Sequence, residues 1–324
     1  MGAQRQKAAV AWLSVISNTL LVLLKLGIGL AIRSVSVISE AIHSGVDLLA
    51  AIIALVAVKT AGKPADNEHP FGHGKVENIS GTVEAFLIFL AAAWIIFEAV
   101  QKLLNPSKAM GEVHWGVIVM LVSAIANTIV SHLLFKVGKR TDSVALQADA
   151  WHLRTDVYTS LGVMTGLAII WIGERLFPTV NLRWVDPVAA LVVAMLIIRA
   201  AWSLTLQSSR DLLDASLPVD EERWIRDYIG RLRPTVHGFH HLRTRKAGHA
   251  RFIEFHLIVE GDMSVDDSHR ISEVMSCDIE ERFPDATVTV HIEPCDGICK
   301  PVCVAGCYLS EDERAAVHRA ADAR

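Results

Sequence analysis

The chain has 324 residues, of which 52% are hydrophobic and 20% are charged, and its mean hydropathy is positive. This composition is too apolar for an ordinary soluble domain of this length and favours a protein of the lipid bilayer. The formal net charge is only −4 and no block of like charge stands out, which argues against nucleic acid as a partner.

Six stretches are apolar enough to cross a bilayer as helices, for which roughly 20 residues are needed. They are residues 8–31, 36–60, 80–103, 113–136, 143–173 and 186–207. We therefore predict a transmembrane domain of six helices over residues 1–207. Lysine and arginine are more frequent on the side of the N-terminus than in the opposite loops. The positive-inside rule then predicts a multi-pass protein of the cell (inner) membrane with both termini in the cytoplasm.

The sequence pattern changes after the last apolar stretch. The segments RFIEFHLIVE and ATVTVHIEP alternate polar and apolar residues, which is typical of half-buried strands, and charged helical stretches flank them. The predicted elements are a helix over 219–232, strands over 240–245 and 251–260, a helix over 266–283 and a strand over 286–293. We predict a small α+β domain over residues 208–294, with its helices on one face of a sheet, followed by a cysteine-rich extension over residues 295–324.

Two details of this domain follow from the helix over 266–283. Asp266 or Asp267 is predicted to cap its N-terminus, since aspartate favours that position. Cys277 is predicted to be buried in it, because free cysteine is among the most buried residue types.

Two short polar strings interrupt the apolar stretches. Residues 40–47 read EAIHSGVD and residues 149–156 read DAWHLRTD, so both follow the pattern acid-Ala-x-His-x-x-x-Asp. Burying an unpaired charge in hydrocarbon costs several kcal/mol. A polar pattern that occurs in two spans therefore indicates a shared purpose.

On a helix, residues four positions apart share a face. His43 and Asp47 therefore point the same way from the second predicted span, and His152 and Asp156 do so from the fifth. If the two faces meet, two imidazoles and two carboxylates converge, which is a donor set typical of four-coordinate Zn²⁺. Mg²⁺ and Ca²⁺ prefer ligand sets made of oxygen alone, so the histidines argue against them.

The alternative is that these side chains hold helices together, with polar neighbours such as Asn18 and Asn127 as partners. The repetition on two spans favours a transport site instead, because ionisable residues inside a membrane are usually functional. Asp149 is predicted to face water or headgroups near a helix end. Lys25 is predicted to lie at the membrane interface or to pack against another helix.

The paired motifs, the phrase HPFGHGKVEN and the tail segments HHLRTR, FIEFHLIVE and VTVHIEP together resemble the cation diffusion facilitators, from about residue 8 to residue 294. The resemblance implies a proton-coupled exporter of divalent metal, not an enzyme, that works as a homodimer. It also implies a metallochaperone-like (ferredoxin-like) cytoplasmic domain. Histidine as the first ligand in both motifs resembles the zinc-preferring members.

A loop after the second span contains Asp66, His69 and His73, with glycines at 72 and 74 that let the backbone bend around a ligand. The spacing alone is equally consistent with a solvated loop whose histidines titrate freely. The resemblance implies that these three residues form a loop metal site.

The tail contains several histidines that fall on strands and a helix of one small domain. By the resemblance, the cytoplasmic metal cluster consists of His240, His256, His269, His291 and Glu293. Glu293 stands where related chains have aspartate, which changes the geometry but keeps a carboxylate. The resemblance also implies that Lys75 and Asp214 are interlocking charges that hold two protomers together. No role is predicted for His237, His241 or His249.

The extension begins CDGICKPVCVAGC, which the resemblance does not cover. Four of the chain's five cysteines recur there at every fourth position, at Cys295, Cys299, Cys303 and Cys307. Gly297, Pro301 and Gly306 favour a turn-rich loop over a helix with one stripe of thiols. Soft-metal binding, a redox pair and an iron–sulfur ligand set all remain open. A reducing cytoplasm argues against structural disulfides.

The sequence therefore predicts a proton-coupled Zn²⁺ exporter that works by alternating access, with Zn²⁺ also bound to the cytoplasmic domain as a regulator. Its predicted partners are a divalent metal ion, protons, a second copy of the chain and the lipid bilayer. A membrane-tethered metal sensor or storage protein is the alternative of another class. A further alternative is the same transporter with Fe²⁺, Mn²⁺, Co²⁺ or Cd²⁺ as its main cargo.

Overall fold

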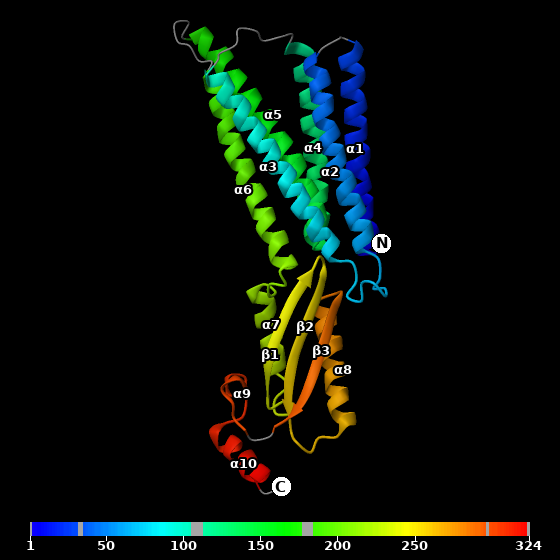
Figure 1. Ribbon diagram of the computed structural model, residues 1–324, viewed down its shortest axis with the longest axis vertical. Coiled ribbons are helices and arrows are strands. Elements are labelled where there is room, and N and C mark those ends of the chain that lie inside the picture. The colour runs from blue at the N-terminus through cyan, green and yellow to red at the C-terminus, as the bar shows by residue number, and fades with distance from the viewer. Residues whose placement is uncertain (1, 32–34, 105–112, 177–183, 296–297, 323–324) are drawn as a thin grey trace. The chain divides into compact units, whose positions relative to one another are not determined.

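The computed structural model describes residues 2–31, 35–104, 113–176, 184–295 and 298–322. The chain divides into two compact units, Met1–Leu212 and Leu213–Arg324. The first unit is helical and the second combines helices with a sheet (Figure 1).

Six long helices make up the described part of the first unit. They are α1 (Ala3–Ala31), α2 (Val35–Ala61), α3 (Lys75–Leu104), α4 (Val113–Arg140), α5 (Val144–Leu176) and α6 (Val185–Leu212). Each corresponds to one predicted span, and most continue beyond it. The extra turns are polar or charged, such as the start of α3 at Lys75, and hydropathy alone does not detect them.

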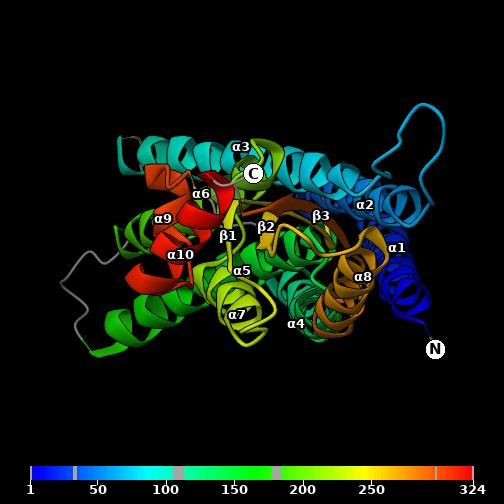
Figure 2. The same cartoon turned by 90° about the horizontal axis from the view of Figure 1, so that it is seen from below.

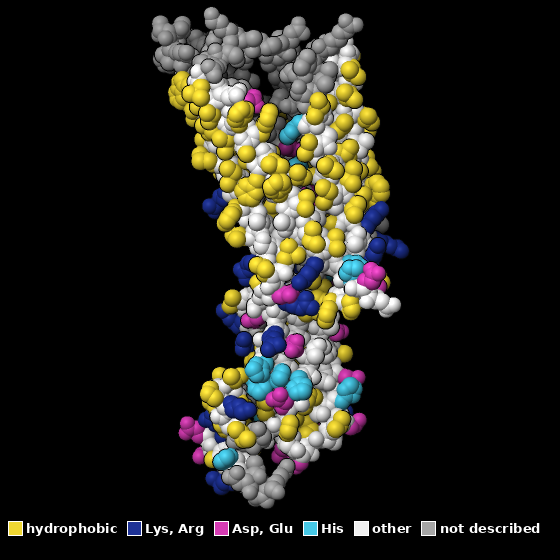
Figure 3. All heavy atoms as spheres, viewed as in Figure 1, with side chains coloured by type: hydrophobic (Ala, Val, Ile, Leu, Met, Phe, Trp, Pro, Cys, Tyr) yellow, Lys and Arg dark blue, Asp and Glu magenta, His cyan; other side chains and the backbone are white. Residues whose placement is uncertain are grey.

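Five of these helices contain a described segment long and apolar enough to cross a membrane: all but α5. Hydrophobic side chains cover much of the surface of this unit (Figure 3). The α5 helix carries the second polar string, and it packs against α2, α3, α4 and α6. Figure 2 shows it between α3 and α4. The unit is therefore a transmembrane helical domain, and the crossing by α5 itself stays a prediction.

Small residues let the helices of this unit approach closely. Ala85 and Ala92 of α3, Ala148 of α5 and Ala201 of α6 are fully buried in one apolar cluster. Close packing of small side chains is how helices associate in a medium as apolar as they are. This packing fixes α5 at the centre of its neighbours.

A buried ion pair ties α1 to α3. Lys7 Nζ lies 3.2 Å from Glu77 Oε1, and their side chains are only 2% and 0% exposed. The hydroxyl of Ser143 donates to Glu77 Oε2 at 2.6 Å. Both charges are therefore compensated away from water.

Removing one partner of this pair should destabilise the protein. We expect Glu77→Gln to cost about 3–5 kcal/mol, because it leaves the ammonium of Lys7 buried without a counter-charge. The measurement is thermal unfolding of the purified protein in detergent. The double variant Lys7→Met with Glu77→Leu should recover much of the loss, and equal loss in both variants would contradict the explanation.

The second unit has the predicted α+β fold. Its main elements are α7 (Val219–Gly230), β1 (Gly238–Ala247), β2 (Ala250–Val259), α8 (Val265–Arg282) and β3 (Ala286–Pro294). The sheet order is β1-β2-β3, with β1 and β2 antiparallel and β2 and β3 parallel. Figure 2 shows α7 and α8 on the same side of the strands. Their buried residues Ile225, Ile229, Met275 and Ile279 pack with Phe255 and other residues of the strands into one core.

Two predictions about α8 are wrong. Its N-cap is Ser264, whose hydroxyl accepts a hydrogen bond from the backbone N–H of Asp267 at 3.1 Å. Cys277 is exposed, not buried. Met275 and Ile279 lie one turn apart on the face that packs into the core, so the residue midway between them points to the opposite side.

The strand β1 contains a bulge that interrupts its pairing with β2. The register shifts between His240 and Arg243, and His241 has a positive φ of 51°. Such a bulge re-aims the side chains around it.

Within residues 298–322, the described part of the extension, there are two helices, α9 (Pro301–Ala305) and α10 (Glu311–Asp322). The prediction of a turn-rich loop is therefore incomplete. Pro301 lies in the first turn of α9, where its missing N–H is tolerated, and Gly306 follows the last residue of that helix. The N-terminus of α10 is closed by reciprocal bonds between Ser310 and Glu313.

Candidate metal sites

The first candidate site lies where α2 packs against α5. His152 Nε2 lies 3.1 Å from Asp47 Oδ1, and His43 Nε2 lies 3.7 Å from Asp156 Oδ1. Donor atoms of His43, Asp47 and Asp156 are all within 4.8 Å of one another. The two pairs are crossed, because each joins a histidine of one helix to an aspartate of the other. We call these four residues the membrane tetrad.

The tetrad is enclosed unevenly. The side chains of Asp47 and His152 are 4% and 6% exposed, whereas that of His43 is 51% exposed within the single chain. His152 Nδ1 is buried and has no hydrogen-bond partner among the described residues. An imidazole nitrogen and clustered carboxylates in an apolar bundle fit a cation that is held by nitrogen and oxygen donors.

The alternative that these side chains only hold helices together accounts for part of the tetrad. Asn127 of α4 donates to Asp156 Oδ2 at 3.5 Å, but Asn18 donates to Ser14 on its own helix. Lys25 is buried, and its Nζ donates to Ser44 Oγ at 2.7 Å, so it joins α1 to α2.

Two further buried acids lie in the helical unit, Asp149 on the tetrad helix α5 and Glu84 on its neighbour α3. The prediction that Asp149 faces water or headgroups is wrong: its side chain is 0% exposed, and neither carboxylate oxygen has a hydrogen-bond partner in the described ranges. It lies one turn before His152 on the central helix α5. Glu84 of α3 is also 0% exposed and accepts from Ser80 Oγ at 3.0 Å. Sequence reasoning missed Glu84, although an acid within an apolar span is itself a signal.

The second candidate site is in the loop between α2 and α3. Asp66 Oδ1 lies 3.3 Å from His69 Nδ1, and Asp66 Oδ2 lies 3.3 Å from His73 Nε2. Gly72 has a φ of 79°, a backbone conformation that glycine adopts without strain, and it lets the chain turn between the two histidines. The backbone N–H of His69 donates to Asp66 and lowers the pKa of that carboxyl. Asp66 is thus kept ionised, as a metal ligand must be.

The third candidate site is a row of histidines across the sheet. In the strand register, His240 of β1 is opposite His256 of β2, which is opposite His291 of β3. His256 follows the core residue Phe255, so the row lies on the face away from α7 and α8. A patch of histidine side chains is visible on the second unit in Figure 3.

Glu293 connects the members of this row. Its Oε2 lies 2.9 Å from His240 Nε2, and its Oε1 lies 2.8 Å from His256 Nδ1 and 3.4 Å from His291 Nε2. Burial by itself would raise the pKa of Glu293, but the hydrogen bond with His256 and the charges of His256 and His240 lower that pKa overall. The substitution of glutamate for the expected aspartate therefore still lets the carboxylate reach its neighbours.

The structure separates one predicted member from this row and adds a neighbour. His269 lies on α8, is 66% exposed and contacts Glu273 at 3.3 Å, so a single chain does not bring it to Glu293. The ring of His241 lies 5.0 Å from that of His256 because the β1 bulge turns it toward the row. No sequence pattern indicated a bulge at this position.

The predicted interlocking charges each have another contact within their own unit. Lys75 Nζ donates to the carbonyl of Leu212 at 3.5 Å. Asp214 Oδ1 lies 3.3 Å from Arg245 Nη1. Their pairing with each other across two protomers stays a prediction.

Comparison with known proteins identifies the family of both units. The family model described as the cation efflux transmembrane domain matches residues 11–213, and that described as the cation efflux protein cytoplasmic domain matches residues 217–295. The chain belongs to the cation diffusion facilitator family. It is thus a multi-pass membrane protein for cation efflux, with a metal-binding cytoplasmic domain. Residues 296–324 lie beyond both matches.

Three relatives of this cation diffusion facilitator illustrate the similarity. An uncharacterised transporter from Synechocystis is 36% identical over 271 residues, which cover 84% of this chain and 85% of that protein. The cation-efflux pump FieF from Citrobacter koseri is 31% identical over 289 residues, covering 89% and 92%. The zinc form of the transporter CzrB is a solved structure that is 37% identical, with a TM-score of 0.25, covering 26% of this chain and 96% of that one.

The lowered pKa of Glu293 predicts a pH-dependent contribution to stability. Because the folded-state pKa lies below the ordinary glutamate value, this contribution is present above that value and is lost as pH falls through the folded pKa. Without metal, Glu293→Gln should therefore lower the free energy of unfolding at neutral pH by about 1 kcal/mol or less, because the group is partly exposed, and the unfolding temperature should fall with it. Thermal unfolding over a pH series measures this, with Glu260→Gln, a substitution of an exposed glutamate, as the control. The difference in stability between Glu293→Gln and the wild type should vanish at acidic pH. A constant difference would contradict it.

The position of His256 in the middle of the row predicts that it is essential to this site. His256→Ala should reduce Zn²⁺ binding by the purified protein by roughly one ion per chain, since it contacts the shared carboxylate and faces both other histidines. Counting bound Zn²⁺ after dialysis measures this. The assignment of His269 to the same cluster predicts a similar loss for His269→Ala, and unchanged binding would remove His269 from it.

Proposed function

We propose that this transporter exports Zn²⁺ from the cytoplasm in exchange for protons, by alternating access of the membrane tetrad to the two sides of the membrane. The crossed pairs Asp47–His152 and His43–Asp156, at 3.1 and 3.7 Å, carry the proposal. Two imidazoles with two carboxylates match the nitrogen and oxygen donors and the four-coordination of Zn²⁺. The burial of Asp47 and His152, whose side chains are 4% and 6% exposed, supports a site enclosed on one side by the helices.

Charge balance supports the coupling to protons. Two ionised aspartates can be neutralised by one divalent cation with neutral imidazoles, or by two protonated histidines. Metal binding requires neutral imidazole and ionised carboxylate, so it must release protons. Exchange of one Zn²⁺ for two protons would keep the net charge of the tetrad constant, which avoids an uncompensated charge in the apolar bundle.

The proposal includes a homodimer in the cell membrane with both termini in the cytoplasm. The positive-inside bias supports this orientation. The charges of Lys75 and Asp214 would orient the two protomers more than stabilise them, because exposed ion pairs contribute little. The histidine row and the loop site would bind cytoplasmic Zn²⁺ and favour one arrangement of the dimer. An effector has this result only if it binds the two arrangements with different affinity.

Transport in reconstituted vesicles tests the exchange. With Zn²⁺ on one side and a pH-sensitive dye on the other, we expect metal uptake accompanied by proton flux in the opposite direction. Asp47→Asn and Asp156→Asn should each lower uptake at least roughly tenfold, because changes even to the partners of metal ligands cost 10–100-fold in affinity. Glu98→Gln, an exposed acid of α3, is the matched control and should transport normally.

Histidine variants and other metals separate the alternatives. His152→Ala should abolish transport, whereas His132→Ala, an exposed histidine of α4, should not. Uptake without any proton flux would contradict the exchange. Metal binding by the cytoplasmic unit with no flux of any ion would favour the sensor or storage alternative. Faster transport of Fe²⁺, Mn²⁺, Co²⁺ or Cd²⁺ than of Zn²⁺ would change the cargo but keep the site.

A further inference from the structure

The extension is a docked part of the second unit. The backbone N–H of Tyr308 donates to the carbonyl of His237 at 2.7 Å, and the N–H of Phe239 donates to the carbonyl of Gly306 at 3.1 Å. A side chain at Gly306 would collide with the carbonyl of Phe239, so only glycine allows this approach. The guanidinium of Arg233 lies 4.1 Å from the ring centre of Tyr308. These contacts hold the segment that carries Cys303 and Cys307 against β1.

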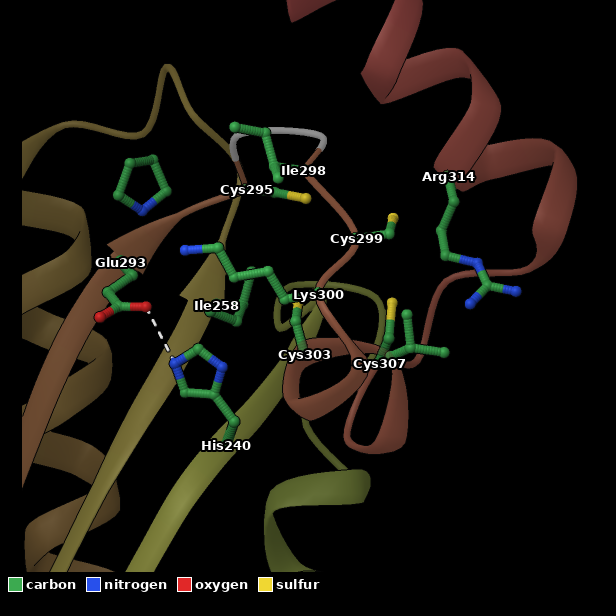
Figure 4. A pocket seen from close by; sticks show the side chains of 12 residues that line it. His240, Ile258, Glu293, Cys295, Ile298, Cys299, Lys300, Cys303, Cys307 and Arg314 are labelled. Atoms are coloured by element: carbon green, nitrogen blue, oxygen red, sulfur yellow. Dashed lines mark hydrogen bonds and ion pairs between the residues drawn. The ribbon is translucent and has the colours of Figure 1, made fainter.

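This docking creates a pocket that contains four thiols. Its lining includes the side chains of Cys295, Cys299, Cys303 and Cys307, and we call it the thiol pocket. His240 and Glu293 of the histidine row line the same pocket, with Glu293 and His240 on one side and Cys299 and Cys307 on the other (Figure 4). All four cysteines are thiols in the structure.

The size and charge of the thiol pocket favour a metal ion as its occupant. Its volume is about 100 Å³, whereas sites for small organic ligands are roughly 300–1,000 Å³. Thiolates are preferred ligands of Zn²⁺ and of softer ions. Four thiolates around a divalent ion leave two excess negative charges. Lys300 and Arg314, which also line the pocket, can offset them.

We propose that the thiol pocket binds one thiophilic metal ion, Zn²⁺ or Cd²⁺, through the four cysteines, beside and separate from the histidine row. Each coordinating thiol gives its proton to solvent when the metal binds. Among the described residues, the groups of three donors within 4.8 Å of one another contain no cysteine. The sulfur atoms must therefore move together around the ion, and binding should tighten the extension.

Cd²⁺ alone is a suitable probe because cadmium–thiolate bonds give a charge-transfer band in the ultraviolet. The full-length protein, purified in detergent, stripped of metal and kept under a reductant, is titrated with Cd²⁺. We expect the band to saturate at one ion per chain. The triple variant Cys299→Ser, Cys303→Ser, Cys307→Ser should lose the band. The control Cys277→Ser, which removes the exposed thiol of α8 outside the pocket, should keep it.

Two further variants keep the test decisive. Cys299→Ser alone changes an exposed side chain, so it should fold normally and still weaken the band. His256→Ala should leave the band intact, which separates the thiol pocket from the histidine row. Reaction of Cys299 with a maleimide should be slowed by Zn²⁺ in the wild type but not in the double variant Cys303→Ser, Cys307→Ser, which keeps Cys299 and removes two of its partner thiols.

Other results would overturn the proposal. These are absence of the band in the wild type, an equal band in the triple variant, equal loss in Cys277→Ser, or disulfides that persist under reductant. None of these measurements involves transport, so the outcome does not depend on whether the membrane tetrad exchanges Zn²⁺ for protons.

Discussion

The electrostatic compensation of Asp47 and Asp156 is the constraint on which the helical unit depends. A carboxylate moved out of water is costly unless an opposite charge or hydrogen-bond donors meet it. Here each aspartate has an imidazole from the facing helix within 3.7 Å or less. Because the imidazole can be neutral or charged, the compensation can come from protons or from a metal ion. The negative charge of the two aspartates must be compensated, and the packing of α2 on α5 brings the histidines close enough to do so.

The same constraint explains the arrangement of the other helices. A helix with this many polar residues cannot face lipid on all sides, and α5 is surrounded by α2, α3, α4 and α6. Its neighbours bring small or apolar residues to it, and Asn127 of α4 brings a hydrogen-bond donor. In the second unit the charges meet under easier conditions, since the histidine row lies on a sheet face that reaches water. Glu293 is 31% exposed there, and its carboxylate stays ionised beside the histidines.

Structural features that depend on residues close in sequence were predicted better than features that depend on contacts between distant segments. The apolar stretches predicted the helices, and period-two alternation predicted the strands, because both depend on residues close in sequence. The spacing of four in each motif predicted which residues of α2 and α5 share a face. Burial of Asp149 was not predictable, because it depends on which helices surround α5, whereas the position of Glu84 inside an apolar span was a signal that sequence reasoning missed. The β1 bulge at His241 and the docking of Gly306 on Phe239 depend on backbone contacts between distant segments, for which the sequence has no local signal.

The crossed arrangement of the membrane tetrad makes both of its pairs depend on the relative position of α2 and α5. Each pair takes one member from α2 and one from α5, with the histidine and the aspartate in opposite order. If α5 slid along α2 by one turn, or rotated away from it, both pairs would separate together. The donor set therefore behaves as a single unit that is either assembled or dispersed. A displacement of one helix relative to the other is therefore enough to separate both pairs at once.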